Sequence, residues 1–403
     1  MTPITLQHGL PERERQLARE LIAAILHAAD PYTAMQSALK PISADRPTHI
    51  LAFGKASIAM THAALNHLGP RFARASILAP EALVLESQFK SKFVHCYPCD
   101  HPLPTERNRA ATQLLLEHAR SIPSDHRALV LISGGASAML CAPKPGVSLL
   151  QIRQTTAEML KRGATIQELN QQRTLMDSLK GGGLARDLRH VIDRRVFLLS
   201  DVIGDDPRII ASGPMHDATP PSSPHIIIAN NESLINAARA WCSSRNIDCP
   251  MIHRRYTADA SEGGGMLVQD LRGLEATRSA AIILGGEPIV NAENHDGIGG
   301  PMLELGLGAV VGLESTDFDW TILSMTSDGI DGPSNAAGMV CTRSMLDQPG
   351  VLGTIRDSIS SHDSLPMCDT LNASIKTGPT GTNVNDLAVL IRWASTQYEQ
   401  ELA

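Results

Sequence analysis

A chain of 403 residues is too long for one ordinary domain and predicts two, or at most three. Hydrophobic residues make up 43% of the chain, which is enough for packed cores, whereas aromatic residues make up only 3%. The net charge of -7 and the few aromatic rings argue against a nucleic-acid surface, which is usually basic and stacks bases on aromatic side chains.

The first residues, the apolar runs and the cysteines predict the cellular compartment of the protein. The first nine residues are polar and have neither the basic start nor the apolar stretch of a signal peptide. No apolar run approaches the roughly 18 residues that a membrane-spanning helix needs. Seven cysteines, an odd number, fit reduced thiols, and the lone CxxC pair at Cys96 and Cys99 lacks the second pair of a zinc site. We expect a cytoplasmic protein.

The first half of the chain alternates between helical periodicity and short apolar runs. The helical periodicity and the turn residues at its ends predict helices at residues 11–29, 57–68, 105–120, 148–162 and 165–179. The apolar runs predict strands at residues 48–53, 82–85, 93–96, 129–132 and 195–200. Thr105 is the expected N-cap of its helix, and Asp30-Pro31 the expected end of the first.

The second half continues the alternation. Strands are predicted at residues 225–229, 247–253, 280–285 and 320–325. Helices are predicted after Asn230 and at residues 258–274, 302–313, 336–346 and 387–394, the first of these ranges being broken by three glycines. Strand and helix alternate throughout, so the sequence predicts an α/β fold with largely parallel sheets.

The segment LVLISGGASAML, residues 129–140, is the clearest candidate site. A buried strand ends in the small turn Ser133-Gly134-Gly135 and is followed by helix-forming residues. Backbone N–H groups at a helix start have no partner, and glycine lets an anion approach them closely. The segment is either a phosphate-binding turn or an ordinary connection between a strand and a helix.

A lysine stands at the corresponding turn of an earlier strand. Gly54-Lys55 resembles the end of a Walker A loop, but His49 and Ala56 stand where that loop needs glycine and a hydroxyl residue. Lys55 is therefore either a clamp for phosphate or a solvated lysine at a helix start.

Five turns combine glycine, a hydroxyl group and a carboxylate or amide at strand ends. They are residues 133–135, 200–205, 285–287, 327–331 and 377–386. Glycine and hydroxyl groups suit phosphate oxygens, and aspartate suits Mg²⁺. Each turn alone is more often a plain tight turn. Five together favour an enzyme that handles phosphate, and the absence of HExxH, GxSxG and GxGxxG weakens metalloprotease, hydrolase and NAD-enzyme alternatives.

Eight motifs in a fixed order resemble those of the glycerate 2-kinase family, whose second domain carries the name MOFRL. They are GKA at 54–56, DHPLP at 100–104, LISGGASAML at 131–140, KGGGLA at 180–185, SDVIGDDPRIIASGP at 200–214, GGE at 285–287, SDGIDGP at 327–333 and TGPTGTNVNDL at 377–387. The resemblance implies a Rossmann-like N-terminal domain with a parallel sheet, residues 1–275, and a smaller α/β MOFRL-type domain, residues 276–403, whose last helix can pack back on the first domain.

The resemblance also implies an activity. The family uses ATP and Mg²⁺ to phosphorylate the 2-hydroxyl of D-glycerate, giving 2-phosphoglycerate and ADP. A proposed catalytic lysine of the family falls on Lys55, where it would stabilise the transferring phosphoryl group. Arg173, expected at the acceptor carboxylate, and Lys180 are the other catalytic candidates.

The remaining site candidates come from the same motifs. Mg²⁺ is expected at Asp201 and Asp328. Substrate and ATP are expected at Gly54, Ser133, Gly134, Gly135, Ser137, Asn230, Glu287, Gly378, Thr380, Thr382, Asn383 and Asn385. The expected partner is a small-molecule substrate, with no nucleic acid and no membrane, and a homodimer is the oligomer considered.

One segment departs from the family. Where the family has GRGGRNQE, residues 297–304 read GIGGPMLE, so Ile298 and Pro301 replace two arginines. Proline has neither charge nor donor and cannot replace a guanidinium, whose charged hydrogen bonds are worth about 1.5–3 kcal/mol each. The alternatives are therefore a kinase of another small hydroxy or sugar acid, a hydroxypyruvate reductase, and an inactive nucleotide-binding relative.

Overall fold

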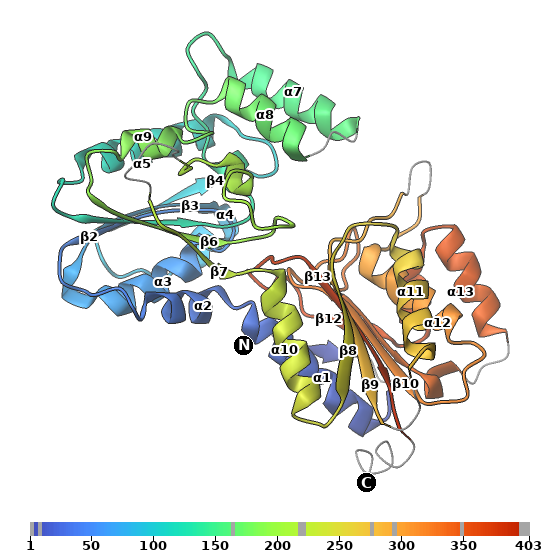
Figure 1. Ribbon diagram of the computed structural model, residues 1–403. Coiled ribbons are helices and arrows are strands. Elements are labelled where there is room, and N and C mark those ends of the chain that lie inside the picture. Colours follow the sequence, from blue (N-terminus) through green and yellow to red (C-terminus); the bar gives the residue numbers. More distant parts are fainter. Residues whose placement is uncertain are drawn as a thin grey trace. The chain divides into compact units, whose positions relative to one another are not determined.

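The computed structural model describes residues 4–6, 10–162, 166–216, 223–274, 278–291, 296–346 and 350–394 (Figure 1). The chain folds into two compact units, and residues of each unit contact mainly one another. We call residues 30–229 the first unit, and residues 1–29 with 230–403 the second unit. The domain boundary expected between residues 275 and 276 falls within the second unit, outside the described residues.

The first unit is built on a six-stranded parallel sheet in the order β4-β3-β2-β5-β6-β7. Its strands are β2 (Thr48–Phe53), β3 (Phe72–Pro80), β4 (Val94–Cys99), β5 (Arg127–Ile132), β6 (Asp193–Leu199) and β7 (His225–Ala229). This is the strand order of a Rossmann sheet, as the sequence predicted. The order reverses between β2 and β5, and ligands of open α/β sheets bind where the carboxyl ends of two such strands meet.

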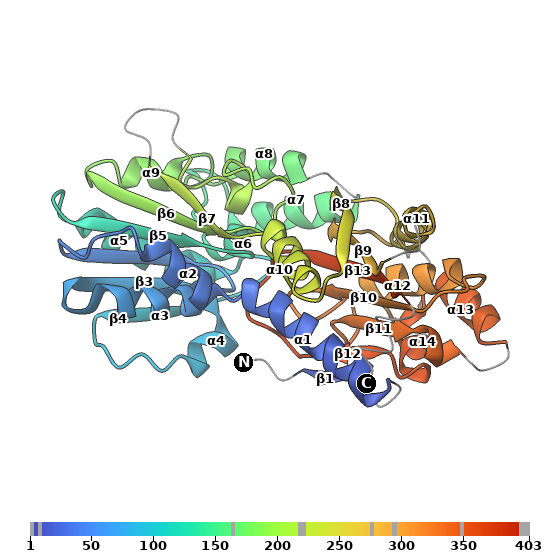
Figure 2. The ribbon, with the colours of Figure 1, turned by 60° about the horizontal axis from the view of Figure 1, so that its bottom comes forward.

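Helices cover both faces of this sheet, α2 and α3 on one and α5 and α9 on the other (Figures 1 and 2). Strands β2 and β5 are buried along their whole length, which explains why THILAF and RALVLI read as continuous apolar runs. The helices are α2 (Pro31–Leu39), α3 (Ser57–Leu68), α4 (Glu81–Glu86), α5 (Glu106–Ser121), α6 (Ala136–Met139), α7 (Leu149–Lys161), α8 (Ile166–Met176) and α9 (Gly183–Asp187).

Three local predictions in the first unit need correction. The strand predicted at residues 82–85 is helix α4, because a run of four apolar residues fits either state and Pro80 and Glu81 provide a helix start. Strand β3 was not predicted. Asp30-Pro31 begins α2 as well as ending α1, since Asp30 accepts a hydrogen bond from Thr33 N at 3.1 Å. The predicted cap at Thr105 is confirmed by its bond from Arg107 N.

The second unit contains a seven-stranded sheet in the order β1-β12-β11-β10-β13-β9-β8. Its strands are β1 (Thr5–Leu6), β8 (Asp248–Tyr256), β9 (Ala280–Gly286), β10 (Trp320–Thr326), β11 (Gly338–Thr342), β12 (Ser374–Lys376) and β13 (Asp386–Arg392). Among the strands of the described residues, only β8 and β9 pair in parallel, and the other neighbouring pairs are antiparallel. The prediction of largely parallel sheets is therefore wrong for this unit.

Two helices predicted near the C-terminus are strands. Residues 336–346 form β11 and a short 3₁₀ turn, Arg343–Leu346. Residues 387–394 form most of β13, which lies between β10 and β9 in the middle of the sheet. The run LAVLI is buried on both faces, so it shows no alternation, and only pairing with two distant strands decides its state.

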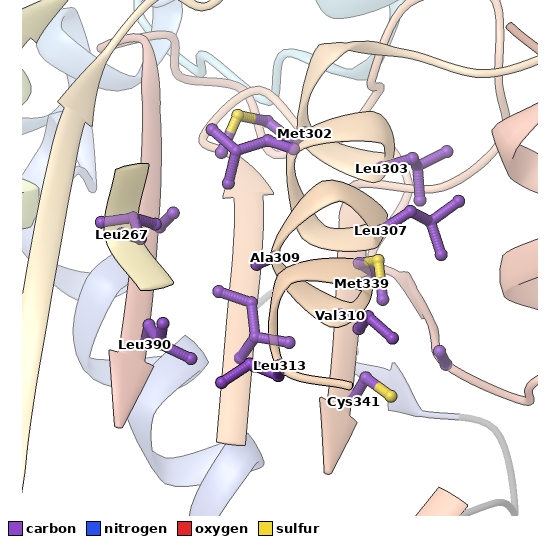
Figure 3. Packing of buried hydrophobic residues seen from close by; sticks show 14 of the residues in the cluster. Leu267, Met302, Leu303, Leu307, Ala309, Val310, Leu313, Met339, Cys341 and Leu390 are labelled. Atoms are coloured by element: carbon purple, nitrogen blue, oxygen red, sulfur yellow. The ribbon is translucent and has the colours of Figure 1, made fainter. Parts of the chain in front are cut away.

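Helices cover both faces of the second sheet as well, with α1 (Glu12–Ala28) and α10 (Asn231–Ser243) on one face (Figure 1). On the other face lie α11 (Ala260–Arg272), α12 (Pro301–Gly312), α13 (Val351–Ser360) and α14 (Ser364–Thr370). Figure 3 shows apolar side chains of α12 packed over Met339, Cys341 and Leu390 of the sheet.

The glycines that interrupted the predicted helix at 258–274 allow two helices to approach closely. A Cβ atom at Gly264 would overlap the Leu305 carbonyl oxygen of α12, and one at Gly308 would lie 2.6 Å from the Ser261 carbonyl oxygen of α11. All seven cysteines are free thiols. None of the helices in the described ranges has an apolar stretch long enough to span a bilayer.

Candidate functional site

In the first unit, two turns meet at the point where the strand order reverses. Gly54 and Lys55 follow β2, and Ser133 and Gly134 follow β5. Lys55 N donates to the Gly134 carbonyl at 2.9 Å, and Ala56 N donates to Ser133 Oγ at 2.9 Å. Gly54 has φ +122°, and a Cβ there would overlap Ser133 Oγ. Gly54 and Ser133 therefore hold the two turns together.

Asp201 joins these turns from the end of β6. Its carboxylate lies so close to Gly134 that a Cβ on that glycine would overlap Asp201 Oδ2. Burial raises the pKa of Asp201, and the charge of Lys55 opposes that rise. The charge of Lys55 is thus felt at the Asp201 carboxylate, a group that can hold a cation or accept a proton.

His101, from the loop after β4, lies beside the turn that follows β5. Its ring packs on Gly135, where a Cβ would lie 3.1 Å from His101 Cδ2. The pKa of His101 is lowered to about 4, because the surrounding protein desolvates the ring and because Lys55 and Arg173 carry positive charge nearby. His101 belongs to the DHPLP motif but was not among the predicted site residues. The available signal was its position after a strand of the same sheet.

Arg173 lies on α8 and, with Ser137 and Lys180, lines a small cavity beside the loop of Pro102. Desolvation lowers the pKa of the Arg173 guanidinium. Across the described ranges, neither the Lys55 ammonium nor this guanidinium has a hydrogen-bonding partner. The structure thus brings both predicted cations to one region with their donors available for an anion.

Lys180 is placed differently. It is buried, and its Nζ donates to the Leu140 carbonyl at 2.7 Å. Burial lowers its pKa, and the nearby Asp177 carboxylate opposes that effect. The contact makes Lys180 a residue that positions the segment after α6.

Ser137 belongs to a hydroxyl and amide chain that sequence reasoning missed. Its Oγ lies 3.0 Å from Ser212 Oγ, which in turn bonds Asn170 Oδ1 at 2.7 Å. Ser212 has φ +63° and follows Ala211 with φ +54°, two non-glycine residues in the left-handed region. Such strain is often stored at functional sites.

The second unit has a polar edge of its own. Glu287 follows β9, Asp328 follows β10, and Asn385 precedes β13. Because β13 runs antiparallel to both neighbours, its start lies beside their ends, and Asp386 pairs with Gly286 and Thr326. Asn385 Nδ2 donates to Glu287 Oε2 at 3.4 Å.

The segment at 377–386 folds over the loop that follows β10. Thr380 N donates to the Asp328 carbonyl at 3.0 Å, and Val384 N donates to Ser327 Oγ at 2.8 Å. Asn383 Oδ1 accepts from Asn385 N at 3.0 Å. Gly378 has φ +65°, and its carbonyl packs so tightly on Gly329 that a Cβ there would overlap it. These contacts fix the predicted site residues Gly378, Thr380, Asn383 and Asn385 next to Asp328.

Thr382 is the predicted residue of this segment with a free hydroxyl. It is 5% exposed, and its Oγ1 has no partner among the described residues. A buried hydroxyl without a partner carries a desolvation cost. A ligand oxygen would remove that cost.

Carboxylates crowd the same edge. Asp331 accepts from Met302 N at 3.1 Å and Leu303 N at 2.8 Å, and burial raises its pKa to about 7 against the effect of those amides. Burial and the charge of Asp331 raise the pKa of Asp386 well above its ordinary value. Sequence reasoning named neither residue as a site residue, and a bound cation would offset their repulsion.

The fit of these carboxylates to Mg²⁺ is partial. In the ranges that the structure describes, no three His, Cys, Asp or Glu side chains form a cluster that could hold a metal ion. Asp201 and Asp328 can each supply one carboxylate, and Mg²⁺ commonly takes one or two carboxylates while water and substrate phosphates complete its shell.

Asn230 has a structural contact. Its side chain caps α10 by accepting from Ser233 N at 3.3 Å. The neighbouring Asn231 instead donates to the Val384 and Asp386 carbonyls, at 3.2 and 2.9 Å. Asn230 therefore has a capping role, and its predicted role in binding substrate or ATP stays a prediction.

The segment that lacks the family arginines is held by backbone contacts. Ile298 N donates to Asp363 Oδ1 at 2.9 Å, and the Ile298 side chain is 49% exposed. Pro301 opens α12, a position that suits proline because its missing N–H would have no partner there. The replacements fit the local fold but provide no positive charge.

Comparisons with known proteins agree with this architecture. A crystal structure of glycerate kinase from Thermotoga maritima superposes with a TM-score of 0.82 at 27% identity, covering 95% of this chain and all of that one. A D-glycerate 2-kinase from Thermotoga maritima is 29% identical over 94% of this chain and 98% of its own. A relative from Agrobacterium vitis, also 29% identical over 94% of both chains, carries a provisional name as a hydroxypyruvate reductase.

Family descriptions account for most of the chain. The domain of unknown function DUF4147 matches residues 17–239, and the MOFRL family matches residues 280–386. The DUF4147 match alone covers more than half of the residues. The chain therefore belongs to the DUF4147 and MOFRL family, and its resemblance to the glycerate 2-kinases is confirmed.

Proposed function

We propose that this protein transfers the γ-phosphoryl group of Mg-ATP to the 2-hydroxyl of D-glycerate, giving 2-phosphoglycerate and ADP. The observation that carries the proposal is that the turn at Ser133–Ser137, after β5, contacts three elements: Lys55 N donates to Gly134, Asp201 lies against Gly134, and Arg173 lines a cavity with Ser137. A kinase for a small acid needs positive charge for phosphate and carboxylate, together with a carboxylate for Mg²⁺ or a proton. The similarity to glycerate kinases supports a kinase.

Each group has a distinct role in the proposal. Lys55 contacts the transferring phosphoryl oxygens, and Arg173 pairs with the acceptor carboxylate in the bidentate manner open to a guanidinium. The turn from Ser133 to Ser137, with Gly134 and Gly135, lets phosphate or acceptor approach the backbone. Lys180 keeps that region in place through Leu140.

The second unit has candidate groups of its own. Asp328 is its candidate Mg²⁺ ligand, separate from Asp201 of the first unit, and a bound ion would neutralise charge on phosphates. The hydroxyl and amide groups of the 377–386 segment, with Glu287, would bind phosphate or acceptor. The unpartnered Thr382 hydroxyl supports this assignment.

A different acceptor is the second candidate. The observation that favours it is the exposed Ile298 and the helix-opening Pro301, which stand where the family has arginines. An acid with a longer or less charged chain would make less use of a guanidinium there. A reductase activity has weaker support, because no GxGxxG turn is present in the sequence.

The decisive experiment measures ADP release by the purified protein with Mg-ATP, with D-glycerate, L-glycerate and four-carbon sugar acids as acceptors. Fast release with D-glycerate that EDTA abolishes would support the proposal. Release only with another acid would favour the second candidate. Oxidation of NADH or NADPH by hydroxypyruvate, followed at 340 nm without ATP, would indicate a reductase. Stabilisation by Mg-ATP without ADP release would indicate an inactive nucleotide-binding relative.

A further inference from the structure

His101 lies against Gly135 and packs there through its ring edge alone. Its ring edge lies 3.1 Å (Cδ2) and 3.4 Å (Nε2) from the position of a Cβ on Gly135. Neither ring nitrogen has a hydrogen-bonding partner within the described part of the chain. Part of the residue is exposed, so the ring is packed on one side and accessible on the other.

The charges around His101 are mainly positive. Lys55 approaches from the turn after β2, and Arg173 from α8, and both disfavour protonation of the ring. Asp100 on its own loop faces Arg107 of α5, with 3.8 Å between Arg107 Nη1 and Asp100 Oδ1. Asp201 lies on the far side of the glycine turn, against Gly134. The imidazole is therefore neutral at pH 7 and has a lone pair to offer.

The structure of a 2-hydroxy acid requires that the side chains that bind it lie close together. Its carboxylate and its hydroxyl are on adjacent carbons, so the side chains that contact them must also be neighbours. If Arg173 binds the carboxylate and Lys55 the incoming phosphoryl group, the hydroxyl lies close to both. His101 is the titratable group within electrostatic reach of both cations that has a free nitrogen.

We propose that His101 is a catalytic residue that takes the proton from the acceptor hydroxyl during phosphoryl transfer; the inference rests on the proposed function. The hydroxyl oxygen forms a bond to the γ-phosphorus of ATP, and the bond from that phosphorus to the bridging oxygen breaks. The electron pair of the broken bond stays on ADP. The hydroxyl proton moves to a ring nitrogen of His101 and then to water across the exposed side of the ring.

Substrate binding makes the ring a better base. The acceptor carboxylate and the phosphates neutralise Arg173 and Lys55, which removes the repulsion that opposes protonation. The proton affinity of His101 then rises by the part of its depression that the two cations cause, while the desolvation of the ring remains. The rival acceptor is Asp201, whose replacement by asparagine would alter Mg²⁺ dependence in the metal role assigned above.

The test compares His101→Gln and His101→Ala with the wild type. The control is His27→Gln, an exposed histidine on α1 of the second unit. We expect His101→Gln to lower kcat on D-glycerate by about 10²-fold to 10⁴-fold, with a smaller change in KM. Wild-type kcat should fall as the pH is lowered, which gives its pH profile an acid limb. His101→Gln should lack that acid limb, and added imidazole should restore part of the kcat of His101→Ala.

Three results separate the outcomes. A wild type that releases no ADP with any acid refutes the proposed function, and the role of His101 with it. An active wild type with a His101→Gln variant within about twofold of it refutes the inference alone. A large loss that keeps the acid limb and does not respond to imidazole also refutes it, because it indicates a positioning role. Thermal midpoints confirm folding, and His101→Asn replaces any variant that fails to fold.

Discussion

Acidification below pH 6.5 should destabilise the first unit through a chain of buried histidines at its amino edge. His49 Nδ1 lies 2.9 Å from His118 Nε2, and His49 Nε2 lies 3.0 Å from His126 Nδ1. His118 Nδ1 contacts Ser76 Oγ at 2.9 Å. His49 is 8% exposed and His118 is fully buried. Neutral rings can satisfy this chain, whereas a charged ring within it is desolvated and faces Arg74.

The magnitude follows from the pKa values. Desolvation, His126 and Arg74 lower the pKa of His49 from 6.5 to about 4, and desolvation with Arg74 and neighbouring histidines lowers that of His118 to about 3. Below pH 6.5 the unfolded chain therefore binds more protons than the folded one, so stability is complete above 6.5 and falls as pH decreases toward 4. At pH 5 each histidine removes about 2 kcal/mol of folding free energy.

The assay must report on the first unit. The three tryptophans, Trp241, Trp320 and Trp393, all belong to the second unit, so their fluorescence does not report on the first. Hydrogen exchange of β2 and β5 amides between pH 7 and 5, with each observed rate divided by the intrinsic rate at that pH, gives the opening free energy of the relevant sheet. His118→Gln should be less stable at pH 7 but should lose less stability on acidification than the wild type.

The exposed His27→Gln, on α1 of the second unit, is the control and should leave this pH dependence unchanged. An equal loss of stability in the wild type and in His118→Gln between pH 7 and 5 would refute the reasoning. So would an opening free energy in the wild type that does not change across that range.

Three other substitutions test the site and the packing. Lys55→Ala should lower kcat by about 10²-fold to 10³-fold in the ADP assay. Its thermal midpoint should stay near that of Lys90→Ala, the control at an exposed lysine. Unchanged turnover would show that Lys55 does not act on the phosphoryl group. Asp201→Asn should raise the Mg²⁺ concentration needed for half-maximal rate, and an unchanged Mg²⁺ titration would exclude it as a ligand. Gly264→Ala should lower the free energy of unfolding by about 1–3 kcal/mol, because its Cβ would overlap the backbone of α12. Gly265→Ala, with open space around it, should leave that free energy unchanged or raise it. Urea unfolding followed by tryptophan fluorescence measures both, and equal effects would contradict the packing argument.

The first sheet was largely predictable because its signals are local. Strands β2 and β5 are short apolar runs that end in glycine turns, and such runs are typical of parallel strands covered on both faces. The second sheet was not. Residues 336–346 and 387–394 contain apolar runs that fit either state, and pairing with distant strands makes them strands. Strands β10 and β12 lie beside β11, and β10 and β9 lie beside β13.

Some residues of the candidate site were predictable from the sequence, and others were not. Lys55, Gly134 and Asp201 stand at strand ends that the sequence marks, and the fold brings them together. His101 and Ser212 were missed, because their importance depends on what they contact: Gly135 in one case and Ser137 in the other. No spacing along the chain encodes those contacts.

The sequence by itself determined the α/β class, the parallel first sheet and the glycine turns, because each depends on residues within a few positions of one another. The order of eight motifs along the chain determined the family. The tertiary structure decided which turns meet, that Lys180 is buried against Leu140, and that β13 is a central strand. Those features depend on contacts between segments far apart in the chain, where burial and pairing outweigh local preference.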